Sequence, residues 1–444
     1  MPENLSNASS IARHVVNNCP AYADFLRANK IDTKKINFKL LPLTDKENYI
    51  KAYPLEQRLY RGHNLADYYM ICTSSGSTGE PTIWPRDYDT DELLALPQTA
   101  FLEEHFQISR QKTLILISLG LGTTQAGMMH LKASWGANKV ANVSVISPNG
   151  DSEMTIFLLQ KLYKQYDQIV CLGYPPLVSD FLDLAIERKL PIKKWNLKIA
   201  LTSQSISASW RRVAIETISG NPGDVVAWYG STEVGMMGFE TKEANFVLTQ
   251  CLKNSELQFD LFQNYNLPTL VEANTLSKYM EVINGEMVIT ADQVVPLVRF
   301  NLHDEAMFIT NQQMKNILQK HHCRTDAIDQ KERLYVAIFG KKLHTVFSTE
   351  DINTVIDQEN IYQLIHREFQ FTEQLKNDHL ILTLTLYVKR AKKISQNKIN
   401  ILNQNIKEKL EKIHQQPIEL NLIIKDETQR VGYKSGKLRY LTTI

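Results

Sequence analysis

The stretch Thr73-Ser-Ser-Gly-Ser-Thr-Gly-Glu-Pro-Thr82 follows the apolar segment YYMIC and contains two glycines. Gly76 and Gly79 let the backbone turn tightly and point its N–H groups into a concavity. The hydroxyl donors around that concavity are Ser74, Ser75, Ser77 and Thr78. Such a loop predicts a phosphate site, although a serine–glycine linker has a similar composition. No Gly-Lys-[Ser/Thr] follows the loop, which argues against the mechanism of a P-loop kinase or ATPase.

Beyond this loop, short apolar runs alternate with segments of helical length, which predicts an α/β fold. We expect buried strands at 112–122 and 167–176, and a helix at 177–189. The strand series continues at 196–202 and 224–229, and the chain becomes β-rich over 272–308. Before the loop, two helices separated by Pro20 are expected.

A polar segment at 311–332 separates the β-rich part from a compact final segment. We therefore expect two domains, 1–330 and 331–444. The final segment has the order strand, helix, strand, strand, helix, strand, which predicts a ferredoxin-like α+β domain. A large α/β body joined to a small domain by a polar link suggests a mobile lid.

Composition and charge restrict the partners and the location that we expect for this protein. The 444 residues carry 50 basic and 48 acidic side chains, a net charge of +2, so we expect no nucleic-acid partner. No apolar run approaches the roughly 20 residues of a membrane helix. The N-terminus lacks the apolar stretch of a signal peptide, so a cytoplasmic protein without a membrane partner is expected. The five scattered cysteines argue against a disulfide framework or a structural zinc site.

Three further segments carry candidate chemistry. In Trp228-Tyr-Gly-Ser-Thr-Glu-Val-Gly235, Gly230 permits close backbone approach, Tyr229 offers a face to a purine, and Glu233 suits a magnesium ion between phosphates. In Pro296-Leu-Val-Arg-Phe-Asn-Leu-His-Asp304, Asp304 can accept both hydroxyls of a ribose, or form a surface salt bridge with Arg299. In the C-terminal tail, Lys437 is either solvated or delivers its charge to a phosphate or carboxylate oxygen.

The order and spacing of these four segments resemble the acyl-adenylate-forming (AMP-binding) superfamily, specifically its phenylacetate–CoA ligase-like branch. The resemblance covers nearly the whole chain and includes LPLTDKENY, ISLGLGTTQAG and LGYPPLVSDFL. Thr82 stands where most other superfamily members have lysine, as in that branch. The resemblance implies a large adenylate-forming domain of mixed β-sheets and helices, and a lid that rotates between two half-reactions.

The resemblance also implies the chemistry: a carboxylate attacks the α-phosphate of ATP, giving acyl-AMP and pyrophosphate, and a thiol then displaces AMP. By motif matching, the loop from Thr73 to Gly79 would hold the β- and γ-phosphates, and Tyr229 with Gly230 would bind adenine. Thr232 would contact the reacting phosphate, Glu233 would bind Mg²⁺, and Asp304 would bind the ribose. Lys437 would bridge the carboxylate and the α-phosphate. The implied cofactors are ATP, Mg²⁺ and CoA, or the phosphopantetheine of a carrier protein.

The sequence departs from the family pattern at three places. The segment 299–304 lacks the family's second arginine and its glycine. The hinge is reduced to 331–340, where Arg333 is the candidate for the hinge arginine without the usual paired aspartates. The adenine-binding segment is Ser203-Gln204-Ser205, without its acid. The residues that the resemblance assigns to acyl-AMP formation are mainly retained. Whether the acyl group is then transferred to a thiol stays open, because hinge and lid residues shape the thiol tunnel.

We expect the acid pocket to be lined from 120–135 and 229–239. Its candidate lining residues are Met128, Met129, Met236, Met237 and Trp135, and the methionines are equally plausible as plain core. The paired lysines Lys341 and Lys342 would meet CoA phosphates or be merely solvated.

The leading hypothesis is an AMP-forming ligase of an aryl or medium acyl acid with CoA, acting as a monomer or homodimer on a small-molecule acid. Alternatives are an adenylation enzyme that loads an acyl carrier protein or a non-thiol acceptor, an adenylyl transferase, and a non-catalytic nucleotide-binding protein.

Overall fold

A mixed eleven-stranded sheet runs through the larger part of the chain in this computed structural model, in the order β10-β11-β12-β13-β9-β8-β7-β6-β5-β3-β4. The structure describes residues 2–74, 80–204, 206–273, 278–341, 347, 349–359, 364–376, 379–389, 392–426 and 429. The strands of this sheet are β3 (Thr113–Ser118), β4 (Val143–Ile146), β5 (Gln168–Gly173), β6 (Leu197–Leu201), β7 (Val225–Ser231), β8 (Gly235–Phe239), β9 (Thr269–Ala273), β10 (Lys278–Ile283), β11 (Glu286–Ala291), β12 (Leu297–Thr310) and β13 (Leu334–Lys341). The expected α/β class is confirmed.

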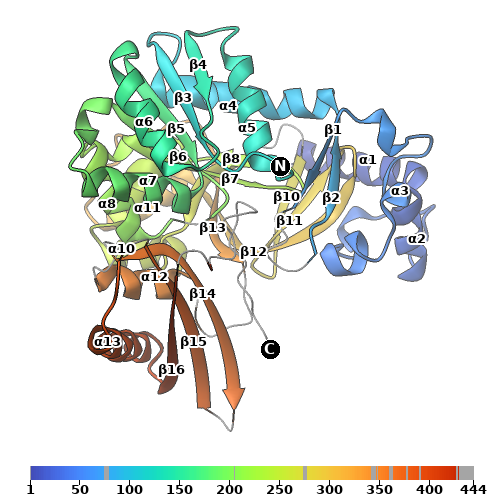
Figure 1. Ribbon diagram of the computed structural model, residues 1–444. Helices are drawn as coiled ribbons and strands as arrows, with labels where there is room; N and C mark the ends of the chain where they lie inside the picture. The colour runs from blue at the N-terminus through green and yellow to red at the C-terminus, as the bar shows by residue number, and fades with distance from the viewer. Residues whose placement is uncertain are drawn as a thin grey trace.

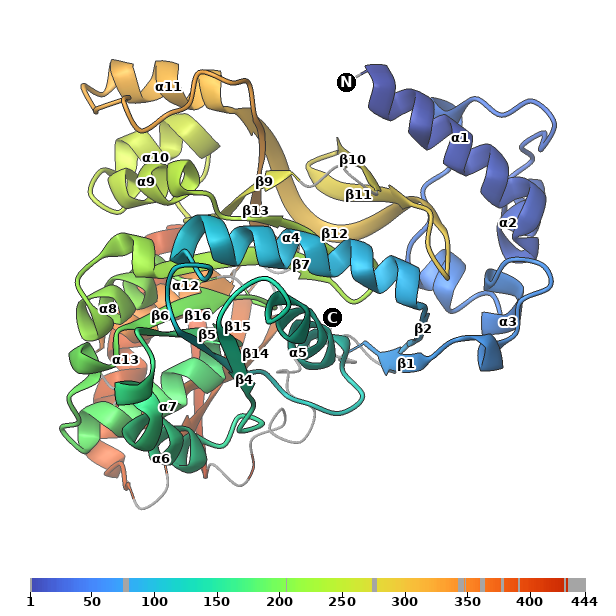
Figure 2. The same ribbon diagram turned by 90° about the horizontal axis from the view of Figure 1, so that it is seen from above.

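One half of this sheet consists of the parallel strands β4, β3, β5, β6 and β7. Helices cover both of its faces, which is why these strands have unbroken apolar sequences. The helices of this half are α4 (Tyr88–Phe106), α5 (Gln125–Ala137), α6 (Ser152–Leu162), α7 (Pro175–Glu187) and α8 (Ala208–Ile218). Helices α6, α7 and α8 share one core with the sheet, and α4 shares the core of the opposite face. Figure 2 shows α4 passing across the sheet beside α5.

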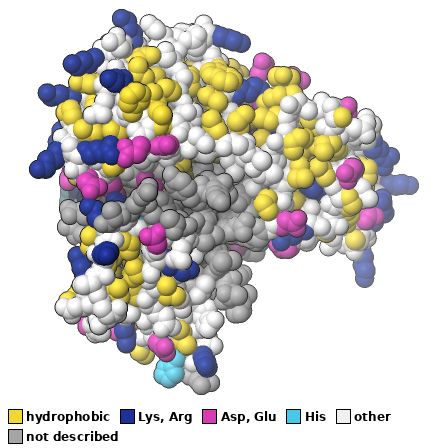
Figure 3. Space-filling view, viewed as in Figure 1, with side chains coloured by type: hydrophobic (Ala, Val, Ile, Leu, Met, Phe, Trp, Pro, Cys, Tyr) yellow, Lys and Arg dark blue, Asp and Glu magenta, His cyan; other side chains and the backbone are white. Residues whose placement is uncertain are grey.

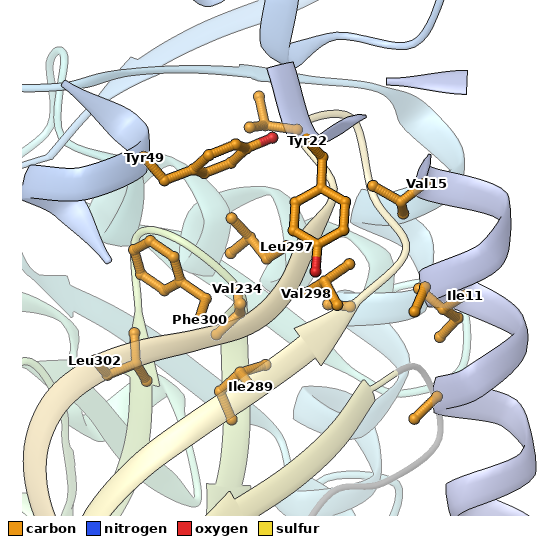
Figure 4. Packing of buried hydrophobic residues seen from close by; sticks show 14 of the residues in the cluster. Ile11, Val15, Tyr22, Tyr49, Val234, Ile289, Leu297, Val298, Phe300 and Leu302 are labelled. Atoms are coloured by element: carbon orange, nitrogen blue, oxygen red, sulfur yellow. The ribbon is translucent and has the colours of Figure 1, made fainter. Parts of the chain in front are cut away.

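The antiparallel half, β8 to β13, curves toward the N-terminal helices α1 (Pro2–Asn18), α2 (Pro20–Ala28) and α3 (Leu55–Arg58). In Figure 4, Ile11 and Val15 of α1 face Val298 and Ile289 of the sheet across a packed core that includes Tyr22. Helices α9 (Lys242–Cys251), α10 (Ser255–Phe262) and α11 (Asn311–Lys320) form a further core with β9 and β13. The N-terminal segment is thus part of the large body.

The hairpin of β1 (Met70–Thr73) and β2 (Ile83–Arg86) carries the predicted phosphate loop. The Ser74 N–H donates to the Thr82 carbonyl at 2.9 Å, and the Thr82 N–H donates to Ser74 Oγ at 2.9 Å. The buried Arg86 donates to Asp91 at the start of α4. These bonds hold the two ends of the loop together and tie the hairpin to the body.

The C-terminal part has a separate sheet of β14 (Ile365–Lys376), β15 (His379–Val388) and β16 (Ile418–Asp426), with helices α12 (Thr349–Gln358) and α13 (Gln396–His414). Figure 1 shows it as a lobe below the large body. The elements follow the predicted order, but the first strand, β13, pairs with β12 and β9 of the large sheet. Strand pairing of the large sheet therefore extends to Lys341, and the division at residue 330 stays a prediction. Among the described residues, no helix has the length and apolarity to cross a membrane.

Candidate active site

A cavity of about 90 Å³ lies between α4, α5 and the strands β6, β7 and β8. Four of the residues predicted to bind the nucleotide line it: Ser203, Tyr229, Gly230 and Thr232. Ser203 has a left-handed backbone with φ of 76°, a costly conformation for a residue with a side chain. At Gly230, an added Cβ would lie 2.8 Å from the carbonyl oxygen of Gly235, so only glycine fits there.

The predicted adenine and ribose residues contact each other. Tyr229, on β7, donates a hydrogen bond of 2.6 Å from its hydroxyl to Asp304 Oδ2, on β12. Burial and the nearby Asp304 carboxylate hold the pKa of Tyr229 well above its ordinary value. The phenol therefore stays protonated and fixes the carboxylate, so that two motifs 75 positions apart converge at one place.

Glu233, the predicted magnesium ligand, is 4% exposed and sits in the turn between β7 and β8. Its carboxylate lies 2.7 Å from Nζ of Lys46, a residue of the LPLTDKENY segment. A carboxylate oxygen is the ligand that Mg²⁺ prefers, so the donor chemistry fits the ion. In the part of the chain that the structure describes, no group of three acidic, histidine or cysteine side chains is placed to hold a metal. Protein ligation of Mg²⁺ would thus rest on Glu233, with phosphate oxygens completing the set.

The same turn rests on a buried lysine. Lys278, on β10, is 3% exposed and donates from Nζ to the carbonyls of Val234 (3.1 Å) and Met236 (2.5 Å). Burial, with a smaller contribution from Arg86, lowers the pKa of Lys278 to about 7. Gln293 also donates to the Glu233 carbonyl at 2.5 Å. The side chains of Lys278 and Gln293 therefore hold the backbone of the turn that contains Glu233.

The structure places the remaining predicted residues as follows. Thr73 bonds through its N–H to the Thr123 carbonyl at 2.7 Å, beside Ser74 at the base of the loop. The loop residues Ser75, Gly76, Ser77, Thr78 and Gly79, together with Ser205, Lys342 and Lys437, lie outside the described residues. Gln204 follows Ser203 but does not line the cavity.

Arg333 lies away from this cavity. It borders a second hollow near Glu104 and forms ion pairs with Glu272 (2.8 Å) and Asp329 (3.3 Å). The structure therefore does not bring it together with Tyr229 and Thr232, and its role as the hinge arginine remains a prediction.

The expected acid pocket needs correction in its aromatic wall. Met129 and Met236 line the cavity as expected, whereas Met237 is buried in the core behind the sheet. Trp135 is 60% exposed because it lies on the outer side of α5. The wall is Trp228, whose ring lies 4.7 Å from that of His130 and 4.8 Å from that of Phe101.

Sequence reasoning also missed His130 and Gln98 in this cavity. His130 lies on α5, and Gln98 lies on α4, 32 positions earlier. No spacing rule connects residues on two helices so far apart in the chain. The available signal was His130 and Ser134 on one face of a helix, four residues apart.

Comparisons with known proteins address the fold. No protein-family model matches the sequence, and no curated protein matches it. Among solved structures, 2-hydroxyisobutyryl-CoA ligase in the postadenylation state with 2-HIB-AMP is 14% identical, with a TM-score of 0.67 over 99% of this chain and 89% of that one. The AtGH3.15 acyl acid amido synthetase gives 13% identity and a TM-score of 0.57 over 98% and 91%.

A third structure, the anthranilate CoA ligase AuaEII with anthranoyl-AMP, gives 10% identity and a TM-score of 0.52 over 83% and 65% of the two chains. The chain therefore shares its fold with these three enzymes.

Proposed function

We propose that this protein activates a carboxylic acid as acyl-AMP, with release of pyrophosphate, and then transfers the acyl group to a thiol, CoA. The observation that carries the proposal is the convergence on one cavity of Tyr229, Gly230 and Thr232, with Asp304 bonded to Tyr229. In the phenylacetate–CoA ligase-like branch, which the sequence resembles, matching segments bind ATP and the acid.

The proposed first half-reaction uses the chain as follows. Tyr229 presents its ring face to adenine while its hydroxyl orients Asp304 toward the ribose. Thr232 contacts the α-phosphate, and the loop from Thr73 to Gly79 holds the outer phosphates. Mg²⁺ at Glu233 would neutralise phosphate charge, and Lys437 would approach from the tail. A carboxylate oxygen of the acid forms a bond to the α-phosphorus as the bond to pyrophosphate breaks.

The acid would lie beside the apolar lining residues Met129, Met236 and Trp228. An aryl or medium acyl acid fits such a lining, since flexible methionines and one aromatic wall accommodate several shapes. Lys341 and Lys342 would contact the CoA phosphates in the second half-reaction.

A second candidate is transfer to a non-thiol acceptor or to a carrier protein. The altered segment 331–340 favours it, because family hinge residues shape the thiol tunnel. The similarity in fold to an acyl acid amido synthetase also favours it. A nucleotide-binding protein without turnover is the third candidate.

The test is pyrophosphate release across a panel of carboxylic acids, run with CoA, with amine acceptors and with neither, followed by mass spectrometry of the products. Acid-dependent release with an acyl-CoA product supports the proposal. Release with an amide product, or with neither product, moves the acceptor away from CoA. Nucleotide binding without release under every condition leaves only the non-catalytic candidate.

A further inference from the structure

Gln98 and His130, which line the cavity, belong to a hydrogen-bond network that leaves one ring nitrogen of His130 unused. His130 Nδ1 lies 2.7 Å from Gln98 Oε1. Gln98 Nε2 donates to the His130 carbonyl (3.3 Å) and to Ser134 Oγ (3.0 Å), and Ser134 Oγ donates to the same carbonyl (2.7 Å). Gln98 and Ser134 are almost completely buried. Three polar side chains thus satisfy one another within the apolar contact between α4 and α5.

This network fixes the proton on the imidazole. A carbonyl oxygen only accepts, so the amide of Gln98 must turn its nitrogen toward the His130 carbonyl and its oxygen toward Nδ1. That oxygen also only accepts, so Nδ1 carries the hydrogen. Burial lowers the pKa of His130 to about 4, so the ring is neutral near pH 7. Nε2 is then a bare acceptor.

Nε2 is available to a ligand. His130 lines the cavity, and within the described part of the chain its Nε2 forms no hydrogen bond. None of the cavity-lining side chains carries a charge. An ammonium group would therefore lose its hydration without gaining a counter-charge, which is costly. A neutral donor, such as a hydroxyl, pairs with Nε2 without that cost.

We propose that His130 Nε2 selects a carboxylic acid that bears a hydroxyl group, which donates a hydrogen bond to this nitrogen inside the cavity. The inference rests on the proposed function for the identity of the cavity as an acid site. An acid without the hydroxyl covers Nε2 with apolar atoms and leaves an acceptor unpaired. Such a loss corresponds to about 10- to 100-fold in affinity.

The test compares matched acids. Phenylacetates and pentanoates carry a hydroxyl, a hydrogen or a methoxy group at each available position, and kcat/KM for ATP–pyrophosphate exchange is measured for each. We expect one hydroxylated acid to exceed both of its partners by about 10-fold or more. The methoxy acid matters because its oxygen accepts but does not donate. In His130→Phe, which keeps a ring of similar size, the ratio should collapse to about one.

A control variant is available in the same region. His105→Phe replaces another partly buried histidine, on α4, that does not line the cavity, and it should keep the preference. Calorimetric titration of the same acids without ATP gives a readout independent of turnover. A hydroxyl preference in binding without exchange supports the inference and contradicts the proposed function. Exchange with no hydroxyl preference at any position, or a preference that survives His130→Phe, overturns the inference, as does a failure to bind any of the acids.

Discussion

Glu233 and Lys46 form an ion pair of 2.7 Å in which the carboxylate is almost fully buried. Glu233 directly follows Thr232, which lines the cavity, so its carboxylate lies close to that cavity. If Glu233 places a metal ion against the ATP phosphates, its charge matters more than its shape. Glu233→Gln should therefore lower acid-dependent pyrophosphate exchange by on the order of 100-fold.

The matched control for that variant is Glu47→Gln, because Glu47 follows Lys46 directly but is exposed and pairs with Lys51. It should leave exchange unchanged. Exchange near the wild-type level in Glu233→Gln would remove Glu233 from the proposed site.

Lys278 links the same turn to pH. Its pKa falls to about 7 in the folded chain, against about 10.5 in an unfolded chain. Between these values the unfolded chain binds a proton that the folded chain does not, so the contribution of Lys278 to stability rises with pH from about 7 to about 10.5. Below about pH 7 both states are protonated and that slope vanishes.

We expect urea titrations at a series of pH values to show this slope in the wild-type protein and to lack it in Lys278→Met. Lys253→Met, at an exposed site on the same body, serves as the control. Equal slopes in wild type and Lys278→Met would contradict the assignment.

The residue scale also shows what a sequence can reveal about a site. Tyr229, Gly230 and Thr232 could be predicted to lie together because they share one short segment at the end of a strand. The aromatic wall was placed at Trp135 instead of Trp228 because the rotation of α5 about its axis depends on packing with α4. Gln98 and His130 were missed for the same reason, since only helix packing brings them together.

At the scale of elements, α8, β7, β8 and α9 are joined by one buried ion pair. Arg211 of α8 donates to both carboxylate oxygens of Glu240, just after β8, at 2.8 and 2.6 Å. Asn245 of α9 donates to the same carboxylate at 2.7 Å. Glu240→Gln leaves the buried guanidinium without its counter-charge and should cost about 3–5 kcal/mol of unfolding free energy.

Denaturant unfolding of Glu240→Gln measures that loss. The comparison is Asp326→Asn, which removes an equally close but fully exposed partner of Arg324, and should change stability little. Similar losses in both variants would mean that burial does not set the importance of the pair.

Element types were predictable from the sequence, whereas one element's partner was not. The apolar run expected at 112–122 is β3, that at 167–176 is β5, and the helix expected at 177–189 is α7. These assignments depend on local periodicity. β13 also reads as a strand, yet its sequence does not say which sheet it joins. Its buried Tyr335, Val336 and Ala337 pair with β9, more than 60 positions earlier.

At the scale of the whole molecule, the C-terminal lobe contacts α7 through polar side-chain pairs. Asp180, Asp183 and Glu187 lie along this helix and pair with His366 (2.9 Å), Lys389 (2.7 Å) and Lys392 (2.7 Å). In Figure 3, acidic and basic side chains lie side by side where the lobe meets the body. Such polar contacts are typical of interfaces between domains of one chain.

Removing two of the acidic charges should loosen this docking. For Asp183→Asn combined with Glu187→Gln, we expect hydrogen exchange of the β14 amides to rise by about 10-fold. The effect should shrink at high salt, where screening already weakens the wild-type pairs. Glu153→Gln breaks an ion pair with Arg188 inside the large body and should leave β14 unchanged. Unchanged exchange in the double variant would place the docking energy elsewhere.

The tail lysine belongs to the same scale because its proposed role depends on the position of the lobe. Lys437→Ala should abolish acyl-AMP formation but leave thiolysis of a supplied acyl-AMP largely intact. Measuring the two half-reactions separately provides the check. Equal damage to both would mean that Lys437 acts in both positions of the lobe or only in folding.

The register between β12 and β13 pairs the backbone of Asp304 with that of Lys341, the last residue of the large sheet before the chain continues toward the lobe. The residue whose carboxylate we assign to the ribose is therefore paired directly with the residue at which the chain leaves the large sheet toward the lobe. If the lobe rotates, as the family resemblance implies, the motion would act first on this backbone pair. Rotation of the lobe would then change the position of Asp304, and with it the affinity for the nucleotide, through this one pair of backbone residues.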